Sequence, residues 1–155
     1  TYLSRNWEYL LMRKIFAVLL LIVIWNSTVP ADILAQSERF LGAWTLVKWT
    51  NVRDGETFYP YGEDPIGQIV YTESGRMTAV LMPSPVPGEF PSQFVGYWGG
   101  FSVQSEAGTV THHVEGSHSS RMRRTDQVRY FRFEGSDRLV LSPGGDSELT
   151  WARVR

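Results

Sequence analysis

Two of the three histidines in this chain, His112 and His113, are adjacent, and Glu115 follows them closely. Apolar and polar residues alternate around them, which is typical of a β-strand with one buried face. Because successive side chains of a strand point to opposite faces, the two imidazoles cannot bind one metal ion together. Val110 and Val114 share a face with His112, and this face is the more apolar one. We therefore predict that His112 points into the protein, whereas His113 and Glu115 point outward.

The chemistry open to these side chains depends on that orientation. An inward His112 is either a core residue satisfied by hydrogen bonds or a group that contacts a ligand or transfers a proton. In the outward orientation, His113 and Glu115 form a surface pair. In the reversed register they enter the interior, where the carboxylate would orient the imidazole as the general base of an isomerase or a cyclase. These three residues are the catalytic candidates, and the choice among them stays open.

Other reactive constellations are not evident in the sequence. A metal site would need a third ligand, and the remaining histidine, His118, falls in a polar loop. Neither a Ser-His-Asp arrangement nor a glycine-rich phosphate loop is apparent, and the chain has no cysteine. We therefore expect neither a metal nor a cofactor, and we leave open whether the protein is an enzyme.

A second strand places an arginine beside two aromatic rings. Arg129, Phe131 and Phe133 share one face, and we expect this face to be inside because two phenyl rings should not both face water. A buried Arg129 needs an acceptor. A ligand carboxylate is one candidate, and Glu115 or a backbone carbonyl is the alternative.

The hairpin around Gly75 supplies further candidates for an interior site. Tyr71 and Met77 are predicted to line a cavity, whereas Ala79 and Leu81 are better explained as ordinary core. The predicted ligand-binding residues are Tyr71, Met77, His112, Arg129 and Phe131.

The elements that carry these residues are short alternating segments separated by turn residues. Asp54-Gly55 suits a tight hairpin, and Gly99-Gly100 suits a bulge or a turn. We predict an all-β fold, a single eight-stranded antiparallel barrel wide enough for one small ligand. One short helical turn is expected at residues 37–41, capped by Ser37. The eight predicted strands cover residues 44–52, 68–72, 76–82, 96–104, 109–115, 127–133, 138–141 and 148–154.

The N-terminal residues read as a targeting segment. Met12 is followed by two basic residues and an apolar run from Ile15 to Trp25, which is shorter than the about 20 residues of a membrane-spanning helix. We predict a start at Met12, a signal peptide within residues 1–35, and a barrel domain over residues 36–155. We expect a secreted or periplasmic protein with no stable membrane span after cleavage. Without a cysteine it cannot be a lipoprotein or contain disulfides.

Charge excludes one class of partner. Residues 36–155 carry 12 basic and 14 acidic side chains, a formal balance of −2, without the basic stripe of a nucleic-acid-binding protein. The exception is the run Arg121-Met122-Arg123-Arg124. We interpret it as a solvated loop, with an anion-binding site or a contact surface for a partner as the alternatives.

Five segments together resemble the bacterial lipocalin-like domain family. They are Gly42-Ala43-Trp44, Tyr59 to Gly67, Tyr71 to Gly75, Thr109 to Glu115 and Thr125 to Phe131. The resemblance implies a small closed barrel with a pocket for a small, mostly apolar molecule. It also implies that Trp44 closes one end of the barrel, with Arg153 packed over its ring. The family has no general reaction to carry over.

Three functions therefore remain open. The first is an exported barrel that binds a small apolar or amphiphilic molecule. The second is an isomerase-type or cyclase-type enzyme on the same barrel, which uses an interior histidine. The third is a ligand-free barrel that binds a partner through the loop at residues 121–124. No oligomeric state is predicted.

Overall fold

The computed structural model describes residues 31–84 and 93–155. The predicted start at Met12 and most of the predicted signal peptide lie outside these residues. Within them, no helix is both long and apolar enough to cross a membrane.

The described residues form one helix and nine strands. They are α2 (Ala31–Glu38), β1 (Gly42–Arg53), β2 (Glu56–Phe58), β3 (Ile66–Tyr71), β4 (Arg76–Met82), β5 (Val95–Gln104), β6 (Thr109–Ser117), β7 (Asp126–Glu134), β8 (Arg138–Gly144) and β9 (Ser147–Arg153).

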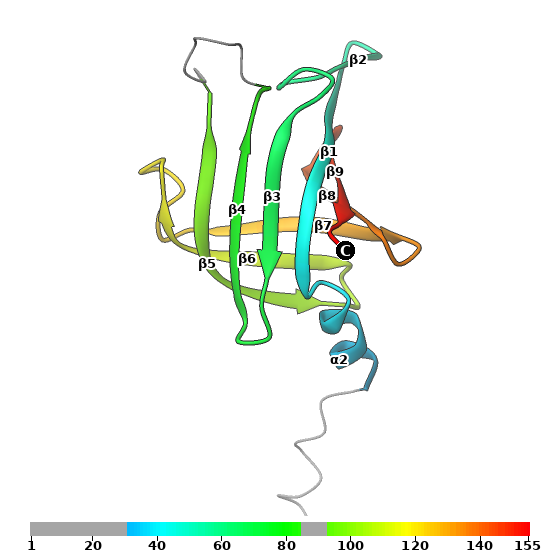
Figure 1. Ribbon diagram of the computed structural model, residues 1–155, viewed down its shortest axis with the longest axis vertical. Coiled ribbons are helices and arrows are strands. Elements are labelled where there is room, and N and C mark those ends of the chain that lie inside the picture. The colour runs from blue at the N-terminus through cyan, green and yellow to red at the C-terminus, as the bar shows by residue number, and fades with distance from the viewer. Residues whose placement is uncertain (1–30, 85–92) are drawn as a thin grey trace, which may run out of the picture. The chain divides into compact units, whose positions relative to one another are not determined.

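Eight of the strands close into a barrel (Figure 1). Each strand from β3 to β9 pairs antiparallel with the next, and β1 pairs with both β3 and β9. β2 only extends β1 through a hairpin. The predicted eight-stranded antiparallel barrel is therefore confirmed. The connections alternate between two ends, which we call the closed end (turns 72–75, 105–108 and 135–137) and the loop end (loops 59–65 and 118–125).

The pairs Asp54-Gly55 and Gly99-Gly100 form the turn and the bulge that the sequence predicts. Asp54 and Gly55 have φ angles of 54° and 81°, the positive values that a type I′ hairpin turn requires. At Gly99 the β5–β6 register shifts by a bulge. A Cβ atom on Gly99 would lie 1.9 Å from the carbonyl oxygen of His113, so only glycine fits there. On Gly100 the nearest atom would be 3.7 Å away.

An aromatic cluster fills the closed end. Phe40 is fully buried and packs edge-on against Tyr71, Phe131 and Phe133, with ring centroids 5.3, 4.9 and 5.0 Å away. Its carbonyl oxygen accepts a 2.8 Å hydrogen bond from Trp44 Nε1. Phe40 therefore anchors the segment that follows α2 to the closed end of the barrel.

The prediction of a helical turn at residues 37–41 is wrong in position. The helix covers Ala31–Glu38, so Ser37 lies near its end instead of capping its start. Single turns then follow, in which Phe40 and Leu41 donate to the carbonyl oxygens of Ser37 and Glu38. The prediction failed because the helix begins inside the range that was assigned to the signal peptide.

Arg153 lies over Trp44 at the closed end. Its guanidinium carbon is 4.1 Å from the ring centroid of Trp44. It also donates to the carbonyl oxygens of Leu41 (2.7 Å), Arg39 (2.7 Å) and Ser136 (3.1 Å). The Arg153 side chain thus connects residues 39–41 between α2 and β1, the first residues of β1, and the β7–β8 turn.

Candidate functional site

His112 lies at the centre of the barrel interior, between two tyrosines. Val110, His112 and Val114 are buried and point inward from β6, whereas His113 and Glu115 are exposed, the orientation that alternation predicts. His112 Nε2 is 2.8 Å from the hydroxyl of Tyr71 on β3, and Nδ1 is 3.0 Å from the hydroxyl of Tyr97 on β5. Three strands therefore supply one hydrogen-bonded group, which we call the Tyr-His-Tyr group.

Burial keeps this group uncharged. Desolvation lowers the pKa of His112 to about 3, helped by the positive charge of Arg129 and by His113. Burial also raises the pKa of Tyr71 well above its usual value and raises the pKa of Tyr97. All three side chains are neutral near pH 7, and so weak a base as His112 is poorly matched to proton abstraction at that pH.

Counting protons shows that one tyrosine hydroxyl hydrogen is left over. A neutral imidazole has one N–H donor and one acceptor nitrogen. One tyrosine must therefore donate to His112, and the other must accept from it. The accepting tyrosine keeps its own hydroxyl hydrogen, which neither bond to His112 uses.

Arg129 points into the same region from β7. Residues 127, 129, 131 and 133 are less exposed than their neighbours, which confirms the predicted inward face of this strand. Arg129 donates to the carbonyl oxygen of Val128 (2.8 Å) and to Gln127 Oε1 (3.4 Å). The positive charge of Arg129 also opposes the rise in the pKa of Tyr97 that burial causes. A backbone carbonyl is thus one acceptor, and Glu115, on the outer face, is not.

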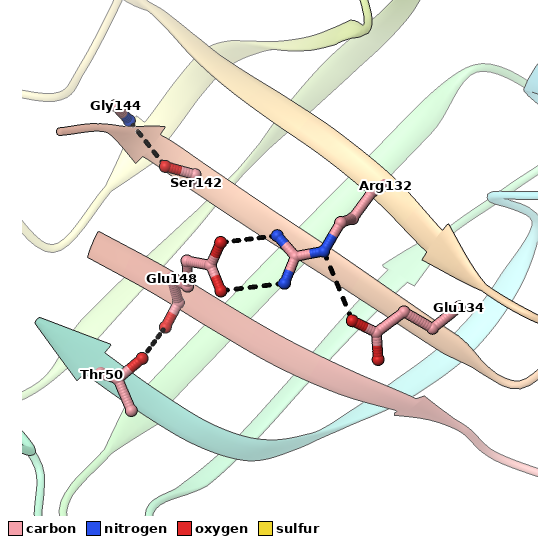
Figure 2. Close-up of polar contacts among 6 residues, drawn as sticks. All are labelled: Thr50, Arg132, Glu134, Ser142, Gly144 and Glu148. Atoms are coloured by element: carbon pink, nitrogen blue, oxygen red, sulfur yellow. Dashed lines mark hydrogen bonds and ion pairs between the residues drawn. The ribbon is translucent and has the colours of Figure 1, made fainter. Parts of the chain in front are cut away.

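Arg129 differs in this respect from Arg76 and Arg132 on the outer face. Figure 2 shows Arg132, also on β7, which reaches the carboxylate of Glu148 on β9 through two bonds of 2.5 and 2.9 Å. Arg132 also contacts Glu134 at 3.3 Å. Among the described residues, no carboxylate forms an ion pair with Arg129. The half-buried Arg129 is therefore a cation without a counter-charge.

The structure brings some of the predicted ligand-binding residues together and separates others. Tyr71 and Tyr97 both meet His112, Arg129 lies opposite Val110 on the neighbouring strand β6, and Met77 is buried opposite Tyr71 in the β3–β4 register. Phe131 lies toward the closed end, within the aromatic cluster.

Sequence reasoning missed Tyr97 and Phe40. Tyr97 alternates with Gly99 and Phe101 along β5, so period-two alternation could have placed it inward. Phe40 precedes the first strand, where no such pattern exists.

The predicted surface pair of His113 and Glu115 does not form. Glu115 makes a bidentate ion pair with Arg76 on β4, and His113 Nδ1 lies 2.8 Å from Asp126 Oδ1 on β7. Residues two apart on a strand are separated by about 6.6 Å, whereas residues directly opposite on paired strands are about 5 Å apart. His113 is directly opposite Asp126, so the cross-strand partner is favoured.

The outer face also holds a Ser-His-Asp arrangement, although none is apparent in the sequence. His113 Nε2 lies 2.9 Å from Ser102 Oγ, opposite its contact with Asp126. The order of these bonds matches that of an acyl-transfer triad. Such chemistry also needs preorganised donors for an oxyanion, but Glu38 and Glu73 line the groove beside Ser102. We interpret this arrangement as a polar ladder across β5, β6 and β7.

The loop between β6 and β7 is basic on its surface. Arg121, Arg123 and Arg124 are exposed, and Met122 turns back to pack against the core. The loop is held by the amide of Arg124, which donates to the carbonyl oxygen of Val114 at 2.8 Å. Positive charge therefore gathers at the loop end of the two strands that carry His112 and Arg129.

Comparisons with known proteins agree with this architecture. A family model described as a lipocalin-like domain matches residues 41–95 and 88–154. The crystal structure of a lipocalin-like protein from Bacteroides uniformis ATCC 8492 superposes with a TM-score of 0.50 and 10% sequence identity, covering 75% of this chain and 99% of that one. At that identity the likeness concerns the fold alone. A search of curated proteins found no match.

Proposed function

The chain belongs to the lipocalin-like domain family, and from that premise we propose that its barrel binds one small amphiphilic molecule. The observation that carries this proposal is the Tyr-His-Tyr group, a polar centre inside a mostly apolar interior. Small-molecule sites are typically apolar cavities with a few convergent polar groups. An eight-stranded barrel is about wide enough for one small ligand.

The ligand is proposed to occupy the half of the interior nearer the loop end. The closed end is filled by the aromatic cluster around Phe40. On the other side of His112, apolar walls come from Ala79, Leu81 and Val114, all buried. Near the loop end, Met122 is only partly buried against the core. An apolar tail would lie among these side chains, and its polar end would reach the Tyr-His-Tyr group.

Carriage of a ligand fits this interior better than the enzymatic alternative. The isomerase or cyclase hypothesis needs either a basic His112 or an inward pair of His113 and Glu115. Burial makes His112 a weak base, and the other two residues point outward. We also infer export by a signal peptide within residues 1–35, which N-terminal sequencing of the mature protein from its host would test.

The test is native mass spectrometry of the mature protein from its own host, followed by denaturing extraction and identification of any bound molecule. We expect one small molecule per chain. A matched pair of variants locates it: Ala79→Phe fills the interior, and Thr78→Phe adds the same ring to the exposed face. Ala79→Phe should abolish retention, and Thr78→Phe should leave it unchanged. An empty wild-type protein, or equal retention by both variants, would favour the partner-binding barrel.

A further inference from the structure

We propose that the ligand carries an anionic oxygen, as in a carboxylate, which binds between Arg129 and the Tyr-His-Tyr group. This inference rests on the proposed function and names the chemical class of its ligand. Two independent features of the interior support it.

The first feature is the charge on Arg129. The side chain is half-buried on the inner face of β7, and its two protein acceptors, a backbone carbonyl and an amide oxygen, are both neutral. A buried cation is unfavourable unless it is paired, and a carboxylate matches the fork of a guanidinium with two parallel bonds. Arg132 is paired in that way with Glu148 on the outer face. We infer that a ligand supplies the corresponding group inside the barrel.

The second feature is the surplus hydroxyl hydrogen. It belongs to Tyr71 or Tyr97, both buried, and a buried donor without an acceptor is costly. Beyond His112, neither hydroxyl has a further hydrogen-bond partner among the described residues. The site therefore presents a cation and a neutral donor but lacks an acceptor. An oxyanion accepts from both and pairs its charge with the guanidinium, whereas an ester or an alcohol offers the guanidinium only a neutral acceptor.

The surrounding charges are compatible with an anion. Among the described residues, the buried polar side chains are threonines and His112, so no buried carboxylate opposes a ligand carboxylate. The exposed arginines at positions 121, 123 and 124 lie at the loop end of the same strands and would attract anions. Loop 59–65, at that end as well, carries Glu63 and Asp64. We therefore place the entry on the β6–β7 side.

The experiment compares acids with neutral molecules of nearly the same shape. Isothermal titration calorimetry at pH 7.5 would measure the binding of 2-naphthoate, decanoate and their methyl esters to the delipidated full chain. We expect each acid to bind at least tenfold more tightly than its ester. Arg129→Gln should remove that preference by weakening acid binding tenfold or more, with little effect on the ester. Arg132→Gln, which removes an arginine from the outer face of the same strand, should keep it.

Three further variants test the roles of the guanidinium and of the tyrosine hydroxyls separately from a loss of fold. Arg129→Lys keeps the positive charge but loses the two parallel bonds of the guanidinium. The preference for the acid over its ester should therefore fall to an intermediate value. Tyr71→Phe and Tyr97→Phe each remove one hydroxyl, and the variant that loses the free hydrogen should bind acids severalfold more weakly. Far-ultraviolet circular dichroism checks that each variant is folded.

The outcomes distinguish the two proposals. If acid and ester bind equally well to the wild type, or if Arg129→Gln keeps the preference, the anion inference is overturned while the binding function stands. Extraction of a neutral molecule from the native protein would likewise overturn the anion inference and leave the binding function standing. If no probe binds and the native protein is empty, both proposals fall.

Discussion

Acidification should destabilise this protein through His112. The pKa of this imidazole is about 3 in the fold and 6.5 in an unfolded chain. Between these values the unfolded state binds a proton that the folded state excludes, so the stabilisation is complete above pH 6.5 and decreases as the pH falls. Each pH unit corresponds to about 1.4 kcal/mol, so lowering the pH from 7.5 to 4.5 should remove about 2–3 kcal/mol.

Urea unfolding at pH 7.5 and pH 4.5 measures this effect. The wild type should lose about 2–3 kcal/mol more than His112→Gln, which has no titrating group at this position. His113→Gln is the matched control, because it removes the adjacent but exposed imidazole and should keep the wild-type pH dependence. The ion-paired carboxylates also titrate in acid. They are common to the wild type and His112→Gln and cancel in that comparison, whereas His113→Gln also removes the partner of Asp126. Equal losses for the wild type and His112→Gln would refute the reasoning.

Three further predictions follow from the fold. Gly99→Ala should cost about 2 kcal/mol or more, because its methyl group meets a carbonyl oxygen, whereas Gly100→Ala should change stability by less than about 0.5 kcal/mol; urea unfolding compares them. Arg153→Lys should cost about 2 kcal/mol in the same assay, because lysine cannot bond three carbonyl oxygens while lying over Trp44. Ser102→Ala should leave the hydrolysis of p-nitrophenyl acetate at the wild-type rate, and a rate or burst that depends on this serine would contradict the polar-ladder interpretation.

Much of the fold could be predicted from the sequence, because each barrel strand has one inner and one outer face. Alternation along β6 and β7 correctly separates His112 from His113 and Arg129 from its neighbours. The Asp54-Gly55 turn follows from the positive φ angles that these two residues tolerate. These features depend on residues that are close together in the chain.

The arrangement of the candidate site could not be predicted, because it depends on register between distant strands. Alternation tells which face a side chain occupies but not which residue lies opposite. Tyr71 and His112 are 41 residues apart, and their contact requires three intervening strand pairings to be known. For the same reason the sequence predicts His113, and not Arg76, as the partner of Glu115.

The pairing of β1 with β9 has a consequence for how the chain folds. The first and last strands of the barrel must meet, and Arg153 bonds to the carbonyl oxygen of Leu41, 112 residues earlier. Contacts of such separation make folding slow, since loop-closure entropy is lost before they form. Until β9 is available, the nascent sheet has two open edges, which can pair with other chains. A chaperone that delays folding until synthesis or transport is complete would therefore protect this protein at its most aggregation-prone stage.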